Sequence, residues 1–194
     1  MVYSRIEKIE EFAKVNNVPI MQKGGIEFLT NYIKENNIKN ILEIGSAIGY
    51  SAIKMALVGD DIKVTTIERD KDRFDIAVTN IKDFNLENRI NIILGDALDI
   101  EITDKYDLIF IDAAKSQYIK FFEKFDKNLN SGGVVVSDNL SFHGLVEDDS
   151  KTNNRNTKQL VRKIRNYIDY LKNNDEYMTT FYELGDGVAI SIKK

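Results

Sequence analysis

The sequence predicts an α/β fold built on a seven-stranded, Rossmann-like sheet that is mostly parallel and carries helices on both faces. After residue 38, short runs of β-branched residues alternate with longer amphipathic stretches, a pattern typical of parallel strands joined by right-handed helical crossovers. The last two strand candidates are separated only by a short turn with two glycines, which predicts an antiparallel hairpin at one edge. With one proline and no repeat or linker, residues 1–194 are expected to form a single domain.

Runs enriched in β-branched and aromatic residues are predicted as the strands. They comprise residues 40–44, 63–67, 90–94, 107–111, 133–137, 177–182 and 188–192. Helical spacing of apolar residues predicts helices between and after the first five strands, at 49–58, 71–84, 115–129 and 154–172. Two more helices, 3–16 and 24–35, precede the first strand, and residues 1–36 are expected to cover the edge of the sheet where ligands bind.

Composition excludes several classes of protein and of site. Hydrophobic residues make up 43% of the chain and charged residues 30%, which is typical of a globular protein and not of a disordered or collagen-like chain. No apolar run approaches the ~20 residues of a membrane span, and the amino end lacks the pattern of a signal peptide, so we expect a cytoplasmic protein. Without Cys and with a single His, the chain cannot build thiolate or histidine-rich metal sites, so any metal would be held by oxygen.

Ligands of such sheets bind beyond the carboxyl ends of the strands, so the residues that follow each strand are the candidates. Gly45 and Gly49 lie in a turn between the first strand and a helix, where glycine permits close approach of a ligand and the helix start offers free N–H groups. Their spacing differs from the G-x-G-x-x-G of nicotinamide-binding turns. The alternative is a glycine turn that binds nothing.

Acidic residues follow the second and third strands. Glu68 lies 19 residues after Gly49, at about the offset from which a carboxylate accepts hydrogen bonds from the hydroxyls of a ribose. Together with the glycine turn it favours an adenosine-containing ligand, whereas the alternative is a solvated carboxylate. Asp96 could accept from an adenine amino group or could be an ordinary helix N-cap.

The fourth and fifth strands are followed by the most specific group of side chains. Asp112 ends one strand, and Asp138 and Asn139 end the neighbouring one, so parallel pairing brings two carboxylates and an amide oxygen together. This hard donor set suits Mg²⁺, Mn²⁺ or Ca²⁺. The alternative is that these residues only cap loops. Convergence of both acids on the predicted ligand edge favours the metal site.

Lys115 begins the helix that follows Asp112, which is an unfavourable place for a cation. A bound divalent cation would lower the pKa of such a lysine and make it a general base for a hydroxyl that the metal has acidified. The alternative is an exposed lysine that pairs with a neighbouring carboxylate.

These residues together resemble the class I S-adenosylmethionine-dependent methyltransferases, and among them the metal-dependent O-methyltransferases of the catechol and caffeoyl-CoA type. The similarity extends from about residue 21 to residue 192 and rests on segments 42–45, 49–51, 95–97, 111–115, 137–139 and 185–187 together with Glu68. The resemblance implies S-adenosylmethionine as methyl donor, bound by Met21, Glu43, Gly45, Ser51, Glu68, Asp96 and Asp112. Among these, Glu68 would hold the ribose, Ser51 the methionine carboxylate and Asp96 the adenine.

The resemblance also implies Mg²⁺ on Asp112, Asp138 and Asn139, with Lys115 as the base. Met21 would lie near the methyl donor, although a core methionine is the alternative. A homodimer is implied by the family only, and the amino-terminal helices could equally cover the site within one chain.

Segments 112–118 and 138–146 are similar to the bacterial branch that methylates 5-hydroxyuridine in tRNA to 5-methoxyuridine. The formal net charge of −4 argues against general nucleic-acid binding, but residues 151–172 carry a net +6. On a helix one face would be basic and the opposite one apolar, the basic face suiting RNA phosphates. The basic residues are Arg155, Lys158, Arg162 and Arg165, and the apolar ones are Leu160, Ile164, Tyr167 and Leu171. The alternative is an ordinary solvated helix.

Three further residues could contact such a substrate. His143, the only histidine, lies in the loop after Asp138, although an exposed loop residue is the alternative. Phe142 and Tyr118 could stack on a flipped base or could be packing residues.

Two other functions fit the same sequence. The first is a small-molecule O-methyltransferase that acts on catechol-like vicinal diols, since the metal ligands would be the same. The second is a non-catalytic adenosine-binding module in which the acidic cluster is only structural.

Overall fold

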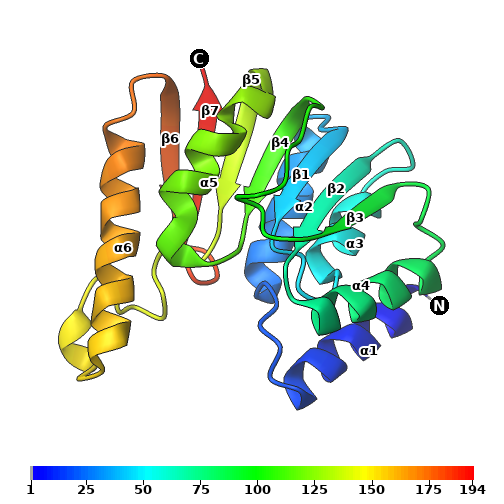
Figure 1. Cartoon of the computed structure of the whole chain (residues 1–194), viewed down its shortest axis with the longest axis horizontal. Coiled ribbons are helices and arrows are strands. Elements are labelled where there is room, and N and C mark those ends of the chain that lie inside the picture. Colours follow the sequence, from blue (N-terminus) through cyan, green and yellow to red (C-terminus); the bar gives the residue numbers. More distant parts are fainter. Residues whose placement is uncertain (1) are drawn as a thin grey trace.

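The computed structural model describes the backbone of residues 2–194 and the side chains from residue 4 onward. Within that range one seven-stranded sheet has the order β3-β2-β1-β4-β5-β7-β6 (Figure 1). The strands are β1 (Asn40–Ile44), β2 (Lys63–Glu68), β3 (Ile90–Leu94), β4 (Tyr106–Ile111), β5 (Leu129–Ser137), β6 (Tyr177–Tyr182) and β7 (Val188–Lys193). β1 to β5 pair in parallel, and β7 pairs antiparallel with both β5 and β6. The predicted fold class, including the antiparallel hairpin at one edge, is confirmed.

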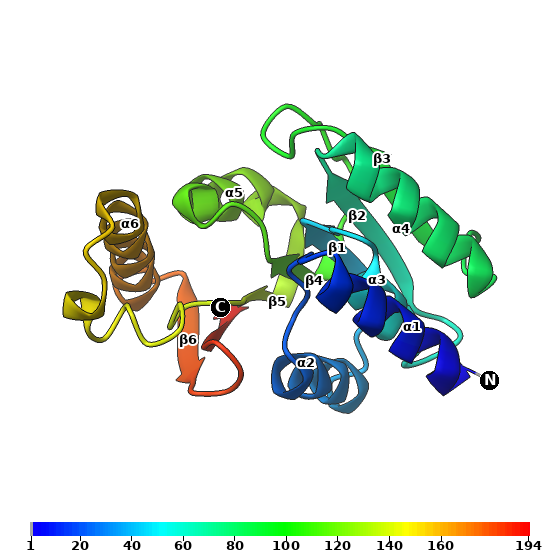
Figure 2. The same cartoon turned by 90° about the horizontal axis from the view of Figure 1, so that it is seen from below.

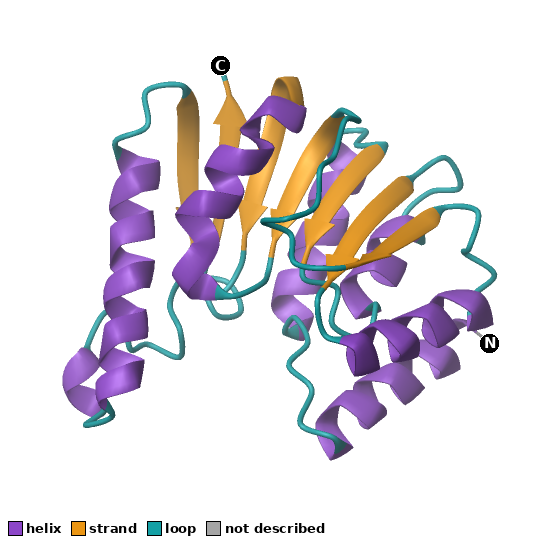
Figure 3. Ribbon diagram, viewed as in Figure 1, coloured by secondary structure: helices purple, strands orange, loops and turns teal. Residues whose placement is uncertain are grey.

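Helices cover both faces of the sheet, as Figures 2 and 3 show. The longer helices are α1 (Val2–Val15), α2 (Lys23–Glu35), α3 (Tyr50–Ala56), α4 (Lys71–Asp83), α5 (Tyr118–Phe125) and α6 (Arg155–Lys172). The first four pack in one buried apolar cluster, and α5 and α6 pack in the other. Consecutive residues of β1 join opposite clusters, Ile41 the first and Leu42 the second. Strands covered on both sides need apolar residues on both faces, which explains the nearly continuous apolar runs.

The predicted helix 115–129 and the strand that follows it differ clearly from the sequence analysis. The helix is divided into η1 (Lys115–Gln117), α5 and η2 (Asp126–Asn128), and Leu129 already belongs to β5. The Asn128 amide donates to the carbonyls of Ile102 and Asp104 at 2.9 and 2.8 Å, which anchors the chain where the helix ends. β5 begins at Leu129, four residues before the predicted start at residue 133, and its pairing with β4 contains a register shift between Tyr106 and Leu108.

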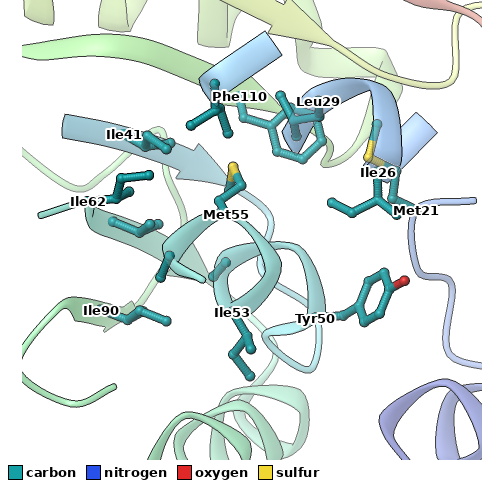
Figure 4. Close-up of a cluster of buried hydrophobic side chains, with 14 of the residues drawn as sticks. Met21, Ile26, Leu29, Ile41, Tyr50, Ile53, Met55, Ile62, Ile90 and Phe110 are labelled. Atoms are coloured by element: carbon teal, nitrogen blue, oxygen red, sulfur yellow. The ribbon is translucent and has the colours of Figure 1, made fainter. Parts of the chain in front are cut away.

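The helices ahead of β1 build the first cluster. Ile26 and Leu29 of α2 are fully buried, and the segment before α2 adds Met21 (Figure 4). The Tyr50 hydroxyl donates to Glu10 at 2.8 Å and so links α3 to α1. None of the described helices is long and apolar enough to cross a membrane.

The strand order reverses between β1 and β4, and the two segments that follow these strands approach each other closely. Gly45 has a φ of 96°, and a Cβ there would lie 2.3 Å from the carbonyl oxygen of Asp112. Glycine is therefore required at this position for both backbone conformation and space. The close approach sets the separation of the two turns that carry the candidate site.

This contact predicts that Gly45→Ala is strongly destabilising. Gly132→Ala is the matched control, because Gly132 also has a positive φ (71°) but its Cβ would meet no described atom within 4 Å. We expect the control to lose about 1 kcal/mol of unfolding free energy from left-handed strain. Gly45→Ala should lose about 3 kcal/mol or more, since backbone must also move. Urea unfolding of the two variants checks this, and equal losses would contradict it.

Candidate active site

The polar residues predicted from the sequence gather at the carboxyl edge of the parallel strands. Glu68 is the last residue of β2, Asp112 follows β4, and Asp138 follows β5. The glycine turn follows β1 and leads into α3, whose N-cap is Gly49 in the left-handed region. One edge of the sheet thus carries all of the predicted acids, as parallel pairing requires.

Glu68 fastens the turn after β1 to the turn after β2. It is 6% exposed, and its two carboxylate oxygens accept the backbone N–H groups of Ala47 and Asp70, both at 2.8 Å. A solvated carboxylate, the alternative from the sequence, is therefore wrong. Because each carboxylate oxygen can accept more than one hydrogen bond, Glu68 retains capacity for a ligand hydroxyl.

Asp96 lies beyond β3, where the described residues 95–105 form no helix. Its Oδ1 accepts the N–H of Leu98 at 2.9 Å, so it stabilises a turn and not a helix start. Its Oδ2 lies 3.9 Å from the Arg69 guanidinium at an exposed position. This oxygen is open to a ligand from solvent.

Glu43 of β1 is completely buried between two hydroxyl groups. Its carboxylate accepts hydrogen bonds from Ser51 of α3 and Thr66 of β2. Burial raises the pKa of Glu43 to about 7, and the two hydroxyl donors oppose this only in part. The Ser51 hydroxyl proton, which the resemblance assigned to a methionine carboxylate, is committed to Glu43.

Thr66 was missed in the sequence analysis. It lies directly opposite Glu43 in the register of β1 and β2 and is fully buried. The sequence signal that could have indicated Thr66 was a hydroxyl residue within the apolar run of β2, since a buried glutamate on the neighbouring strand needs a hydrogen-bond donor.

Met21 lies just before α2 and is 4% exposed. A Cβ on Gly25 would lie 3.0 Å from its terminal methyl carbon, so the methionine packs on the first turn of α2. In Figure 4 it lies beside Ile26 in the first apolar cluster. Met21 thus has the packing environment that the core alternative predicted.

Asp112, Asp138 and Asn139 converge as the sequence predicts. Asp138 is 2% exposed, and burial followed by the nearby Asp112 charge raises its pKa to about 7. Asp112 is half-buried, and this partial burial also raises its pKa. The Asn139 amide N–H donates to Asp138 Oδ2 at 2.7 Å, so its amide oxygen is free to serve as a ligand.

These donors fit a hard divalent cation. The buried carboxylate of Asp138 and the half-buried carboxylate of Asp112 repel each other, and a dication would relieve this repulsion while accepting oxygen ligands. No group of three His, Cys, Asp or Glu side chains with metal-site geometry occurs in the described part of the chain. The candidate donors are the two carboxylates and the one amide oxygen, a set that would leave coordination positions for water or substrate.

Lys115 lies next to this acidic pair. It begins η1 and is partly buried, and its positive charge opposes, without overcoming, the rise in pKa that burial causes at Asp112 and Asp138. Its ammonium nitrogen lies 5.8 Å from the centroid of the Phe142 ring. Lys115 thus faces both the acids and the loop after β5, as a base for a substrate between them would.

The loop of residues 139–148, hereafter the 139–148 loop, borders the site beyond Asp138. The Phe142 and His143 rings stack with centroids 5.6 Å apart, and the His143 side chain is 69% exposed. Tyr118 is 1% exposed, and its hydroxyl donates to the carbonyl of Asp138 at 3.0 Å. The prediction that Tyr118 could stack on a substrate base is therefore wrong, because the ring is part of the core.

The basic helix α6 lies beside this loop. Arg155 and Arg162 are exposed and Lys158 is partly so. Arg165 donates to the Val146 carbonyl at 2.9 Å and pairs with Asp149 at 3.1 Å, so it fastens the loop to α6.

The apolar face of α6 is close to the predicted one. Its buried residues are Val161, Ile164, Tyr167 and Leu171, and Leu160 is only partly buried. Because Arg165 is bonded to Val146 and Asp149, three of the four cations predicted for the basic face, Arg155, Lys158 and Arg162, are left without an ion pair among the described residues.

Comparisons with known proteins give one consistent result. The family model described as O-methyltransferase matches residues 4–194. A crystal structure from Staphylococcus aureus, described as a "putative caffeoyl-CoA O-methyltransferase", is 45% identical, with a TM-score of 0.94 over 97% of this chain and 92% of that one. The O-methyltransferase from Bacillus cereus, solved in complex with SAH, is 28% identical, with a TM-score of 0.83 over 98% and 91% of the two chains. The caffeoyl-CoA O-methyltransferase of Populus kitakamiensis is 29% identical over 84% of this chain and 73% of that protein.

The raised pKa of Glu43 predicts a pH-dependent contribution to stability. Its ordinary pKa is 4.5 and its folded pKa is about 7, so the folded state prefers the protonated form. The unfolding free energy therefore falls as pH rises from about 4.5 to about 7, by about 3 kcal/mol for this group, and is constant above. Glu43→Gln should remove this part of the pH dependence.

Urea unfolding at pH 5 and pH 8 checks this. The change in unfolding free energy between the two pH values is compared between variant and wild type, so that the contributions of the other acidic residues cancel. Glu87→Gln is the matched control, because Glu87 is exposed. A variant whose loss of stability between the two pH values equals that of the wild type would contradict the prediction.

Proposed function

Because residues 4–194 match the family model, the chain belongs to the O-methyltransferase family, and we propose that it methylates a hydroxyl that adjoins a second metal-binding oxygen. The methyl donor is S-adenosylmethionine, in keeping with the SAH bound to the Bacillus cereus relative. The proposed metal is Mg²⁺, with Mn²⁺ or Ca²⁺ as alternatives of the same chemistry. The observation that carries the proposal is the convergence of Asp112, Asp138 and Lys115 at one edge of the sheet.

Each residue of this group has a defined part. Asp112, Asp138 and Asn139 would hold the cation, which when bound lowers the pKa of the acceptor hydroxyl and fixes its orientation. Lys115 would take the hydroxyl proton as the new oxygen–methyl bond forms and the sulfur–methyl bond breaks. The thioether product leaves, and Lys115 returns its proton to solvent.

The methyl donor would be held at the turns after β1, β2 and β3. Glu68 accepts from ribose hydroxyls with its remaining lone pairs, and Asp96 Oδ2 accepts from the adenine amino group. Gly45 allows the backbone to approach the donor, since no side chain projects there. Buried Glu43, held by Ser51, would shape the floor of this region, and Met21, packed in the core just before α2, would support it.

For the acceptor we propose 5-hydroxyuridine in tRNA, whose 5-hydroxyl and 4-carbonyl oxygens form a chelating pair. This choice is supported by the cations of α6, of which Arg155 and Arg162 are exposed and Lys158 partly so, because the same helix is bonded to the 139–148 loop through Arg165 and Val146. Cations at such a position can pair with phosphates on either side of a target base. Exposed His143 and Phe142 in the same loop can contact the base itself.

The second candidate acceptor is a small catechol-like vicinal diol. It is supported by the names of the Staphylococcus aureus and Populus kitakamiensis relatives, which refer to caffeoyl-CoA. The overall charge of −4 also favours a small substrate over a polyanion. Both acceptors present two adjacent oxygens, so the metal ligands do not discriminate between them.

Calorimetry tests the metal site without any acceptor. We expect one Mg²⁺ to bind the complex with S-adenosylhomocysteine, and Asp138→Asn to weaken this binding by about 100-fold. Asp175→Asn changes an exposed acid in the turn between α6 and β6 and should bind the metal like the wild type. Absence of a Mg²⁺ response in a wild-type protein that binds S-adenosylhomocysteine would instead favour a non-catalytic adenosine-binding module.

Methyl transfer from labelled S-adenosylmethionine identifies the acceptor. Transfer to tRNA lacking 5-methoxyuridine should be lost with EDTA and should fall by about 10³-fold in Lys115→Ala. Arg155→Glu with Arg162→Glu should reduce transfer to tRNA by about 100-fold and leave a catechol nearly unaffected.

The control is the double variant Lys34→Glu with Lys63→Glu. It reverses two exposed charges near the amino-terminal ends of the strands, away from the carboxyl ends that carry the site. Equal transfer to tRNA by both double variants would reject the RNA acceptor. Label only in the catechol would assign the enzyme to small diols.

A further inference from the structure

The turn of residues 183–187 between β6 and β7, hereafter the β6–β7 turn, is bonded to the 139–148 loop along the backbone. The N–H of Ser141 donates to the carbonyl of Asp186 at 2.7 Å, and the N–H of Leu140 donates to the carbonyl of Gly187 at 3.0 Å. A Cβ on Gly187 would lie 2.7 Å from the nitrogen of Ser141. The two segments are thus in direct backbone contact, with no room for a side chain at Gly187.

Asp186 adds a side-chain bond to this contact. Its carboxylate is 5% exposed, and Oδ1 accepts the backbone N–H of His143. Its Oδ2 lies 3.5 Å from His143 Nδ1 without hydrogen-bond geometry, and no donor for it occurs among the described residues. One hydrogen bond, from the backbone N–H of His143, is thus the only one among the described residues that compensates for removing this carboxylate from water.

The loop that donates this hydrogen bond has an unusual backbone. Asn139, Phe142 and His143 all have positive φ, at 64°, 48° and 60°. Residues with a Cβ adopt this region at a cost in free energy and only when their surroundings hold them there. The bond from His143 to Asp186 fixes the last of these three strained residues, adjacent to Phe142.

We propose that Asp186 is a positioning residue that clasps the 139–148 loop in its strained conformation. The clasp acts through the backbone N–H of His143 and thereby keeps the Phe142 ring opposite Lys115. The effect of Asp186 on acceptor binding rests on the proposed function, because the loop borders the acceptor only if methyl transfer occurs at the Asp112–Asp138 pair. Asp186 touches no reacting atom.

Hydrogen exchange tests the clasp independently of activity. In Asp186→Ala, the amides of residues 140–146 should exchange about tenfold faster, while those of β1 and β4 stay unchanged. Asp186→Asn keeps an acceptor oxygen and should restore most of the protection. His143→Ala keeps the backbone N–H and should also retain it. Exchange in Asp186→Ala equal to wild type, or a loss in His143→Ala as large as in Asp186→Ala, would overturn the clasp.

Kinetics then test its consequence with whichever acceptor, tRNA or a catechol, the wild type methylates. Asp186→Ala should raise the acceptor KM about tenfold, with the affinity for S-adenosylhomocysteine unchanged by calorimetry. Glycine adopts positive φ freely, so adding His143→Gly to Asp186→Ala should recover part of the lost kcat/KM. Equal losses of acceptor and S-adenosylhomocysteine binding, without recovery in the double variant, would reject positioning in favour of general destabilisation.

The two proposals can fail separately. A wild-type protein that methylates neither acceptor refutes the proposed function, whereas the exchange comparison still decides whether Asp186 holds the loop. Conversely, unchanged exchange and KM in Asp186→Ala, in an active enzyme, refute the clasp alone.

Discussion

Burial of carboxylates at one edge of the sheet is the constraint on which the rest of this structure depends. Glu43, Glu68, Asp138 and Asp186 are each at most 6% exposed, although a buried charge is costly unless it is bonded. Each is accommodated in a different way. Glu68 and Asp186 accept backbone N–H groups and thereby join neighbouring turns, whereas Glu43 and Asp138 have pKa values raised to about 7 by burial.

These accommodations divide the edge into two halves on either side of the β1–β4 reversal. On one side, Glu68 and Glu43 organise hydroxyls and backbone amides around the glycine turn, where neutral hydrogen-bonding groups of a nucleoside can bind. On the other side, Asp112 and Asp138 remain without an ion pair at bonding distance among the described residues. That excess of negative charge suits a dication, and Lys115 beside it suits proton transfer. The contact of Gly45 with the Asp112 carbonyl keeps the two halves adjacent.

Much of this arrangement was predictable because it follows from local pattern. Alternating β-branched and amphipathic segments indicated the strands, and parallel pairing then brought Asp112 and Asp138 to one edge. The helix 115–129 was predicted too long because nothing local reveals that Asn128 bonds to carbonyls more than twenty residues earlier in the chain. Arg165 was assigned to the basic face by helical periodicity, but a partner on another segment, Asp149, removes it.

The sequence by itself determined the order of the elements, the family resemblance and the set of polar residues at the carboxyl edge, since these depend on spacing along the chain. The tertiary structure alone decided which of those residues are available. It buried Tyr118, committed Ser51 to Glu43, and turned Asp186 toward the 139–148 loop. The physical reason is that hydrogen-bond partners and burial are set by segments distant in sequence, whose approach is fixed only when both faces of the sheet are packed.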